Sequence, residues 1–152
     1  PEHTWGLLLA LVRKIPLATN SVKDGHWQRE LFFGNELYGK QIGIVGFGRV
    51  GKIISQYANA FKMSVVFSDP YVEVSDKAYS FAKKVSLDEL LMTSDFVSLH
   101  PPLNEDTRHL ISKDEFSKMK KQPFLINTSR GKIVCEKDLL LALKNKKVTS
   151  AR

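Results

Sequence analysis

The most regular hydrophobic pattern in the chain lies between residues 41 and 61. Ile42, Ile44 and Val45 form a short apolar run, which predicts a buried strand. A glycine-rich turn at 46–51 follows directly, and apolar residues then recur at helical spacing from 52 to 61. The pattern therefore predicts a strand, a glycine turn and a helix in immediate succession.

Apolar runs and helical patterns keep alternating over the rest of the chain. The predicted strands are 63–67, 83–85, 96–99, 124–127 and 148–151, and the predicted helices are 87–92, 112–120 and 136–145, with a short helix within 71–79. Apolar strands that alternate with helices are typical of a parallel sheet covered on both faces. We therefore predict an α/β fold, a doubly wound Rossmann-like sheet of order 3-2-1-4-5-6. Its sixth strand is expected to be truncated at the end of the sequence.

The first forty residues follow a different pattern. A helix that is apolar on most sides is predicted over 5–12, and a second over 16–24, where Gly25 fits a C-terminal cap. Residues 26–40 are irregular and rich in aromatic side chains. So many exposed aromatics are unusual in a free loop, and we expect this segment to pack on its own domain or on a partner subunit.

Composition narrows the class of protein. With 152 residues, 43% hydrophobic and 26% charged, the chain is long enough for one globular core. The single Cys135 excludes an internal disulfide framework and favours a reducing compartment. The densest apolar run, 7–12, is too short to span a membrane. We expect a cytoplasmic protein without a membrane partner.

The formal charge of +7 suggests nucleic-acid binding as one alternative. The lysines, however, are spread over predicted helix surfaces, and no aromatic residues interleave with them as a stacking surface would require. We interpret them as solvated helix faces and expect no nucleic-acid partner. No spacing of Cys or His indicates a metal site.

The glycine turn carries the first chemical signal. Gly46 permits the tight turn, Gly48 lets the backbone approach a pyrophosphate, and Gly51 lets helix and strand pack closely. The next strand ends at Asp69, about 20 residues further on, where a carboxylate accepts hydrogen bonds from the adenosine ribose and repels a 2′-phosphate. This predicts NAD rather than NADP. The alternative is a structural turn with a capping aspartate.

Longer stretches carry a resemblance to a known family. They are EHTWGLLLALVRKI, ELYGKQIGIVGFGRVG, SDPY, SLDELLMTSDFVSLHPPLNEDTRHLI and FLINTSRGKIV. Together they resemble the D-isomer-specific 2-hydroxyacid dehydrogenases, which include the phosphoglycerate dehydrogenases. The resemblance implies an NAD-binding domain whose reaction is hydride transfer between NAD and a D-2-hydroxy acid or 2-oxo acid.

The resemblance also assigns roles to individual positions. Arg49 and Val50 would lie against the pyrophosphate, His100 and Pro102 would line the cofactor cleft beside Thr107, and Thr128, Ser129 and Arg130 would pass under the nicotinamide. Arg130 matches the family's catalytic arginine, whose guanidinium can bind the substrate carboxylate and polarise the 2-oxo group. Read without the family, Arg130 is equally consistent with a surface salt bridge.

Reduction of a 2-oxo acid also needs a proton donor, normally a histidine oriented by a carboxylate. In the family these two residues follow the stretch that matches this sequence, and a separate substrate domain lies outside it. We expect residues 1–152 to bind NAD and to catalyse little or nothing, with 1–40 as a helical dimer segment and 41–152 as the Rossmann core. The resemblance implies a homodimer through the first helix and residues 27–38. The alternative function is an NAD-responsive corepressor-like binding module.

Overall fold

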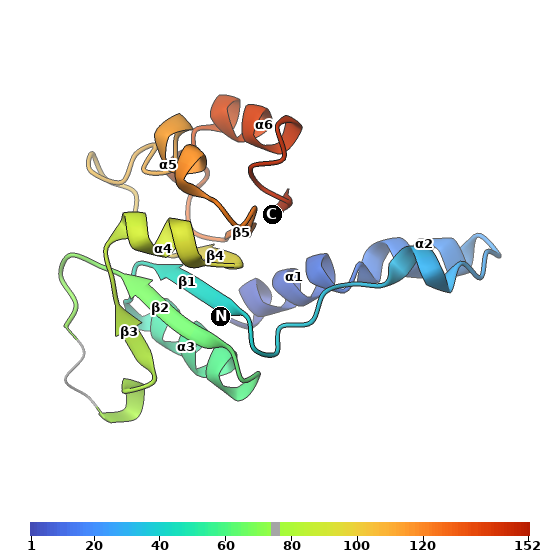
Figure 1. Ribbon diagram of the computed structural model, residues 1–152, viewed down its shortest axis with the longest axis horizontal. Helices are drawn as coiled ribbons and strands as arrows, with labels where there is room; N and C mark the ends of the chain where they lie inside the picture. Colours follow the sequence, from blue (N-terminus) through green and yellow to red (C-terminus); the bar gives the residue numbers. More distant parts are fainter. Residues whose placement is uncertain (74–76) are drawn as a thin grey trace.

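The computed structural model describes residues 1–73 and 77–152, and its centre is a six-stranded parallel sheet (Figure 1). The strand order is β3-β2-β1-β4-β5-β6, which confirms the predicted fold class and order. The strands are β1 (Gln41–Val45), β2 (Ser64–Ser68), β3 (Ala82–Lys84), β4 (Phe96–Leu99), β5 (Phe124–Asn127) and the two-residue β6 (Ser150–Ala151). All neighbouring strands pair in parallel.

Helices cover both faces of the sheet. In Figure 1, α1 (Glu2–Val12) and α3 (Arg49–Ala60) lie on one side, and α4 (Leu87–Thr93), α5 (Lys113–Lys118) and α6 (Glu136–Lys144) lie on the other. Three short 3-10 helices, η1 (Arg29–Phe32), η2 (Lys77–Tyr79) and η3 (Gly131–Ile133), occur in the connections. The short helix expected within 71–79 corresponds in part to η2, and its positions 74–76 lie outside the described residues.

Successive side chains of a strand point to opposite faces of the sheet, so neighbouring residues of one strand belong to two different cores. Ile42 and Ile44 of β1 join the cluster that contains Leu8 of α1 and Ile54 of α3. Val45 joins the second cluster, under α4, α5 and α6. Because α1 contributes to the first cluster, part of the helical segment 1–40 shares a core with residues 41–152.

Local signals account for the starts of α4 and α5. The Ser86 hydroxyl accepts the Glu89 N–H at 3.1 Å and so caps α4. Ser112 and Glu115 form the complete capping box of α5, with the Ser112 N–H donating to the Glu115 carboxylate at 3.2 Å. The helix α5 ends at Lys118, two residues earlier than expected.

An arm extends away from the sheet. It consists of α2 (Ile15–Lys23) and the segment that returns to β1 (Figure 1). Gly25, with a φ of 80°, ends α2 as predicted. Of the two expected packing partners of residues 26–40, their own domain covers few of the aromatics, since Trp27 is 81% exposed and Phe33 and Tyr38 are exposed as well; packing on a partner subunit stays a prediction. The hydrophobic side chain that the segment does bury against the core is Leu37.

No helix in the described ranges, 1–73 and 77–152, combines the length and apolar character that a membrane crossing requires.

Candidate functional site

The carboxyl ends of the strands surround two adjoining hollows. The glycine-side hollow, of about 370 Å³, is lined by residues that include Gly46, Gly48, Asp69, Leu87, Thr107 and Leu110. The arginine-side hollow, of about 730 Å³, is lined by residues that include His3, Thr4, Arg49, Val50, Thr128, Ser129 and Arg130. His100, Pro101 and Pro102 line both, so the two hollows adjoin along these residues, and we call the two together the cleft. Such a position is typical of ligand sites in doubly wound sheets.

Two of the three predicted glycines are required by the fold itself. Gly46 has a φ of 85°, and a Cβ atom there would lie 2.8 Å from the Pro101 nitrogen. At Gly51, a Cβ atom would lie 2.3 Å from the Gly46 carbonyl oxygen. Gly51 lines neither hollow. It lets α3 pack closely on the turn that follows β1.

Gly48 is different, because nothing in the protein requires it to be glycine. Its φ of −74° suits any residue, and a Cβ atom there would meet no atom within 4 Å. It is the N-cap of the twelve-residue helix α3, where free backbone N–H groups favour an anion. The open space in front of Gly48 therefore fits a phosphate that approaches the backbone closely.

The charge at the start of α3 indicates the same ligand. Arg49 occupies the first helical position, and no acidic residue lies in the first turn. A cation at this end opposes the helix dipole, at a cost of about 0.3–1 kcal/mol. An anionic ligand in the hollow would reverse that cost.

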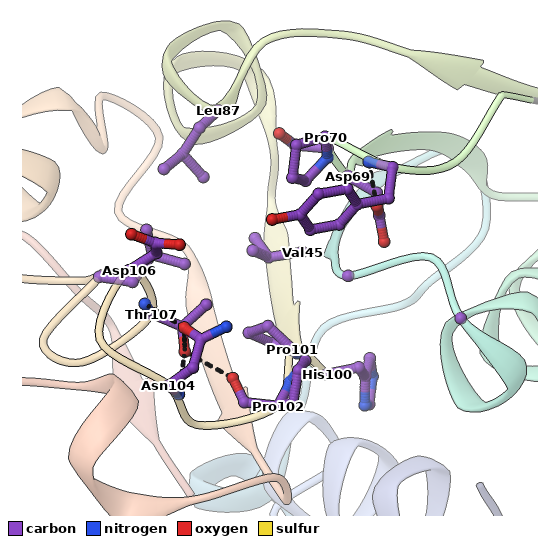
Figure 2. Close-up of a pocket in the computed structure, with 15 residues that line it drawn as sticks. Val45, Asp69, Pro70, Leu87, His100, Pro101, Pro102, Asn104, Asp106 and Thr107 are labelled. Atoms are coloured by element: carbon purple, nitrogen blue, oxygen red, sulfur yellow. Dashed lines mark hydrogen bonds between the residues drawn. The ribbon is translucent and has the colours of Figure 1, made fainter.

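Asp69 ends β2 and faces the 100–107 loop across the glycine-side hollow (Figure 2). Its carboxylate accepts the Phe47 N–H at 2.8 Å and the Tyr71 N–H at 2.8 Å. These bonds hold the carboxylate against the glycine turn. A carboxylate has about four acceptor positions, so two remain for ribose hydroxyls.

The loop after β4 forms the opposite wall. Figure 2 shows Thr107 and Asn104 linked to each other, and the Thr107 hydroxyl donates to the Pro102 carbonyl at 2.5 Å. Thr107 thus lies beside Pro102, as the resemblance implied. Leu87 and Leu110 add apolar surface to this hollow, which a planar base can contact.

The loop after β5 is held from several directions. The Ser129 hydroxyl donates to the Pro101 carbonyl at 2.5 Å, and the Thr128 hydroxyl is hydrogen-bonded to the Thr4 hydroxyl at 2.7 Å. The Asn127 side chain accepts the Ser129 N–H and donates to the Arg130 carbonyl. This bracing fixes the backbone that carries Arg130.

Among the described residues, the lining of the arginine-side hollow includes two arginines and no carboxylate. Arg130 and Arg49 both line it, together with His3. Arg130 is exposed and forms no salt bridge in the described part of the chain; one of its Nη atoms donates to the Ser129 carbonyl. The alternative of a surface salt bridge is therefore not what the structure contains, and the guanidinium remains available to an anionic group.

His100 lies where the two hollows meet. Its Nε2 atom is hydrogen-bonded to the Ser98 hydroxyl at 2.8 Å. Burial lowers the pKa of His100 to about 4. The imidazole is therefore neutral at pH 7.

Sequence reasoning missed several residues of the cleft. Thr4 and His3 come from the start of α1, within the first stretch that resembles the family, but no local pattern places them beside Thr128. Ser98 could have been found, because it is two residues before His100 in a strand and so shares its face. His26 and His109 line neither hollow. Within the described ranges, no group of His, Cys, Asp and Glu is arranged to hold a metal ion.

Comparison with known proteins adds independent evidence. Residues 5–152 match the model of the D-isomer specific 2-hydroxyacid dehydrogenase, NAD binding domain. The chain is 41% identical to a D-3-phosphoglycerate dehydrogenase of Methanocaldococcus jannaschii, over 99% of this chain and 29% of that protein. It is 39% identical to a hydroxypyruvate reductase of Thermotoga maritima, over 99% of this chain and 48% of that protein. The chain thus spans less than half the length of these relatives.

Solved structures agree with this assignment. The apo-structure of D-lactate dehydrogenase from Escherichia coli matches with a TM-score of 0.93 and 32% identity, over 99% of this chain and 47% of that chain. A D-lactate dehydrogenase from Aquifex aeolicus, complexed with NAD and lactic acid, matches with a TM-score of 0.91 and 35% identity, over 99% and 45%. Fold, cleft and sequence therefore lead to one conclusion: the chain belongs to the NAD-binding domain family of the D-isomer specific 2-hydroxyacid dehydrogenases.

Proposed function

We propose that this chain is the cofactor half of an oxidoreductase that transfers a hydride between NAD and a D-2-hydroxy acid or 2-oxo acid. The observation that carries the proposal is the cleft of two adjoining hollows, with Asp69 on its glycine side, Arg130 on its arginine side, and His100 lining both. A cleft with an anchored carboxylate at one end and a free guanidinium at the other suits a dinucleotide followed by a substrate carboxylate.

The residues of the cleft have separate roles in binding the cofactor and the substrate. Asp69 binds the adenosine ribose, the open backbone at Gly48 and the Arg49 side chain bind the pyrophosphate, and Thr128 and Ser129 lie under the nicotinamide. NAD, when bound, accepts or supplies the hydride. Arg130 holds the substrate carboxylate with paired N–H donors and polarises the 2-oxo oxygen, which lowers the barrier to hydride addition.

We infer that the chain by itself turns over little substrate. The reaction requires a proton donor at the 2-oxo oxygen, normally a histidine oriented by a carboxylate. In the described ranges no histidine side chain is hydrogen-bonded to an acid, and the one imidazole bonded to another side chain, His100, is bonded to Ser98. Relatives named phosphoglycerate dehydrogenase, hydroxypyruvate reductase and D-lactate dehydrogenase support a small 2-hydroxy or 2-oxo acid as the substrate class.

We further propose that the chain forms a homodimer through the arm and α1. Apolar side chains on the arm are exposed to an extent that a monomer rarely tolerates, namely Ile15, Leu17, Val22, Trp27, Leu31, Phe33 and Tyr38. A second copy that covers them would remove this area from water. Light scattering that shows a monomer at micromolar concentration would contradict the dimer. A cytoplasmic location, expected from the single cysteine, stays a prediction.

The test of the NAD proposal is calorimetric titration of the chain with NAD, with NADP as competitor. We expect saturable NAD binding, weaker NADP binding, and a loss of NAD affinity in Asp69→Ala. The matched control is Asp24→Ala, which removes an exposed carboxylate at the end of α2 and should leave affinity unchanged. A folded chain that binds no NAD would overturn the proposal.

The alternative, an NAD-responsive binding module of the same family, shares the NAD site and differs in chemistry. A longer parent protein that binds NAD yet reduces no 2-oxo acid would favour this alternative. NAD-dependent turnover by that parent would exclude it.

A further inference from the structure

A buried serine lies behind the histidine of the cleft. Ser98 is in the middle of β4 and is 1% exposed. Its hydroxyl and the His100 Nε2 atom are 2.8 Å apart, and neither side chain has another side-chain hydrogen bond in the described part of the chain. Because they are two residues apart on a strand, both point to the face covered by α1 and α3, as Phe96 does.

This bond determines which ring nitrogen of His100 is left for a ligand. Nε2 is occupied by Ser98, and Nδ1 has no partner among the described residues. Nδ1 is also not among the fully buried unpaired polar atoms, which within the described part are Trp5 Nε1 and Ser94 Oγ. His100 lines both hollows, and Nδ1 is the ring nitrogen that is both unpaired among the described residues and not fully buried.

The charges around the cleft determine whether an N–H group or a lone pair on Nδ1 of His100 would favour ligand binding. A neutral imidazole carries its proton on one nitrogen and a lone pair on the other. The described lining of the arginine-side hollow includes Arg49 and Arg130 and no carboxylate, as suits an anionic ligand. A lone pair on Nδ1 would repel the oxygen atoms of such a ligand, whereas an N–H group would donate to them.

We propose that Ser98 is a positioning residue that acts through His100. Its hydroxyl donates to Nε2, which keeps the ring proton on Nδ1 and presents that N–H to an oxygen acceptor of the bound dinucleotide where the two hollows meet. The proposal rests on NAD binding as proposed above, and it assigns Ser98 a role that its buried place in a strand does not reveal.

The proton position can be measured directly by NMR of the imidazole nitrogens in the ¹⁵N-labelled chain. The sequence has four histidines, and the signals of His100 are those lost in His100→Asn. We expect a protonated Nδ1 and an unprotonated Nε2 in the wild type at pH 7. In Ser98→Ala this preference should weaken, because Nε2 has lost its donor.

The affinity for NAD gives a second readout. Ser98→Ala should weaken binding about fivefold, which corresponds to one hydrogen bond. The same substitution should have no further effect in the His100→Asn background, because Ser98 acts only through the ring. The matched control is Ser94→Ala, which removes a buried hydroxyl that makes no hydrogen bond in the described structure. It should change neither the ring signals nor the affinity.

A protonated Nε2 in the wild type would overturn the proposal. So would a Ser98→Ala variant with unchanged ring signals, or one whose weaker binding persists without His100. A wild-type chain that binds no NAD would refute the proposed function and the ligand role of the N–H together. The ring signals would still decide, separately, whether Ser98 fixes the proton on Nδ1.

Discussion

The two halves of the cleft are built in different ways. On the glycine side, one carboxylate, that of Asp69, accepts two backbone N–H groups and ties the ends of β1 and β2 together. On the arginine side, the wall is assembled from α1, α3 and the loops after β4 and β5, and few bonds cross between them. The glycine side is therefore held by bonds to backbone groups, whereas the arginine side brings together side chains from distant parts of the sequence.

This difference suits two tasks. The part of a ligand that does not react, such as a ribose and its phosphates, is best held by backbone groups whose positions the fold itself fixes. A reacting group needs a charged side chain that is not already paired, and Arg130 forms no salt bridge in the described part of the chain. The four predictions below test this contrast through the stability of the folded chain.

The largest effect is expected for Gly46→Ala. A Cβ atom would lie 2.8 Å from the Pro101 nitrogen, and the φ of 85° would be strained. Strain and overlap together should lower the free energy of unfolding by about 3 kcal/mol or more. Urea unfolding followed by circular dichroism measures this. A change below about 1 kcal/mol would mean that the turn is not the rigid half of the cleft.

A second large effect is expected from pH. The pKa of His100 is lowered from 6.5 to about 4 in the folded chain, so the unfolded chain binds more protons between these values. Stability should therefore be fully present above pH 6.5 and be lost as the pH falls toward 4, by up to about 3 kcal/mol. The His100→Gln variant should lack this part of the pH dependence. An identical acid profile in both proteins would contradict the buried neutral ring.

A smaller effect is expected for Thr4→Val, which removes the hydrogen bond to Thr128 without changing the shape of the side chain. Thr4 is 4% exposed, so the loss should be about 1 kcal/mol. The control is Thr19→Val on the exposed face of α2, where the hydroxyl bonds only to the Ile15 carbonyl. Equal effects at both positions would show that the Thr4 bond does not brace the arginine side.

The smallest effect on stability is expected for Gly48→Ala. Nothing lies within 4 Å of the new Cβ atom, so the free energy of unfolding should change by less than about 1 kcal/mol. NAD affinity should nevertheless fall at least about tenfold, because the methyl group occupies the space of the phosphate. Gly6→Ala, at an open position in α1, is the control and should leave binding unchanged. Unchanged NAD binding in Gly48→Ala would refute the proposal that a phosphate occupies the open space in front of Gly48.

Local patterns located every strand of the sheet to within two residues at each end. The strands 96–99 and 124–127 have their predicted bounds, because strands buried on both faces are largely apolar. The capping residues Ser86 and Ser112 start their helices for reasons contained within a few residues. The arm was predicted less well, since a run of aromatics does not say what it packs against, and Trp27 is exposed while Leu37 is buried.

The sequence by itself determined the fold class, the strand order, the place of the glycine turn and the place of Asp69 at the end of the second strand. These features depend on hydrophobic period and backbone conformation. Only the tertiary structure decided that Thr4 meets Thr128 and that Gly48 faces open space while Gly46 is enclosed. The physical reason is that such contacts join segments far apart in the chain or depend on the space around a residue. Residue type and spacing describe neither.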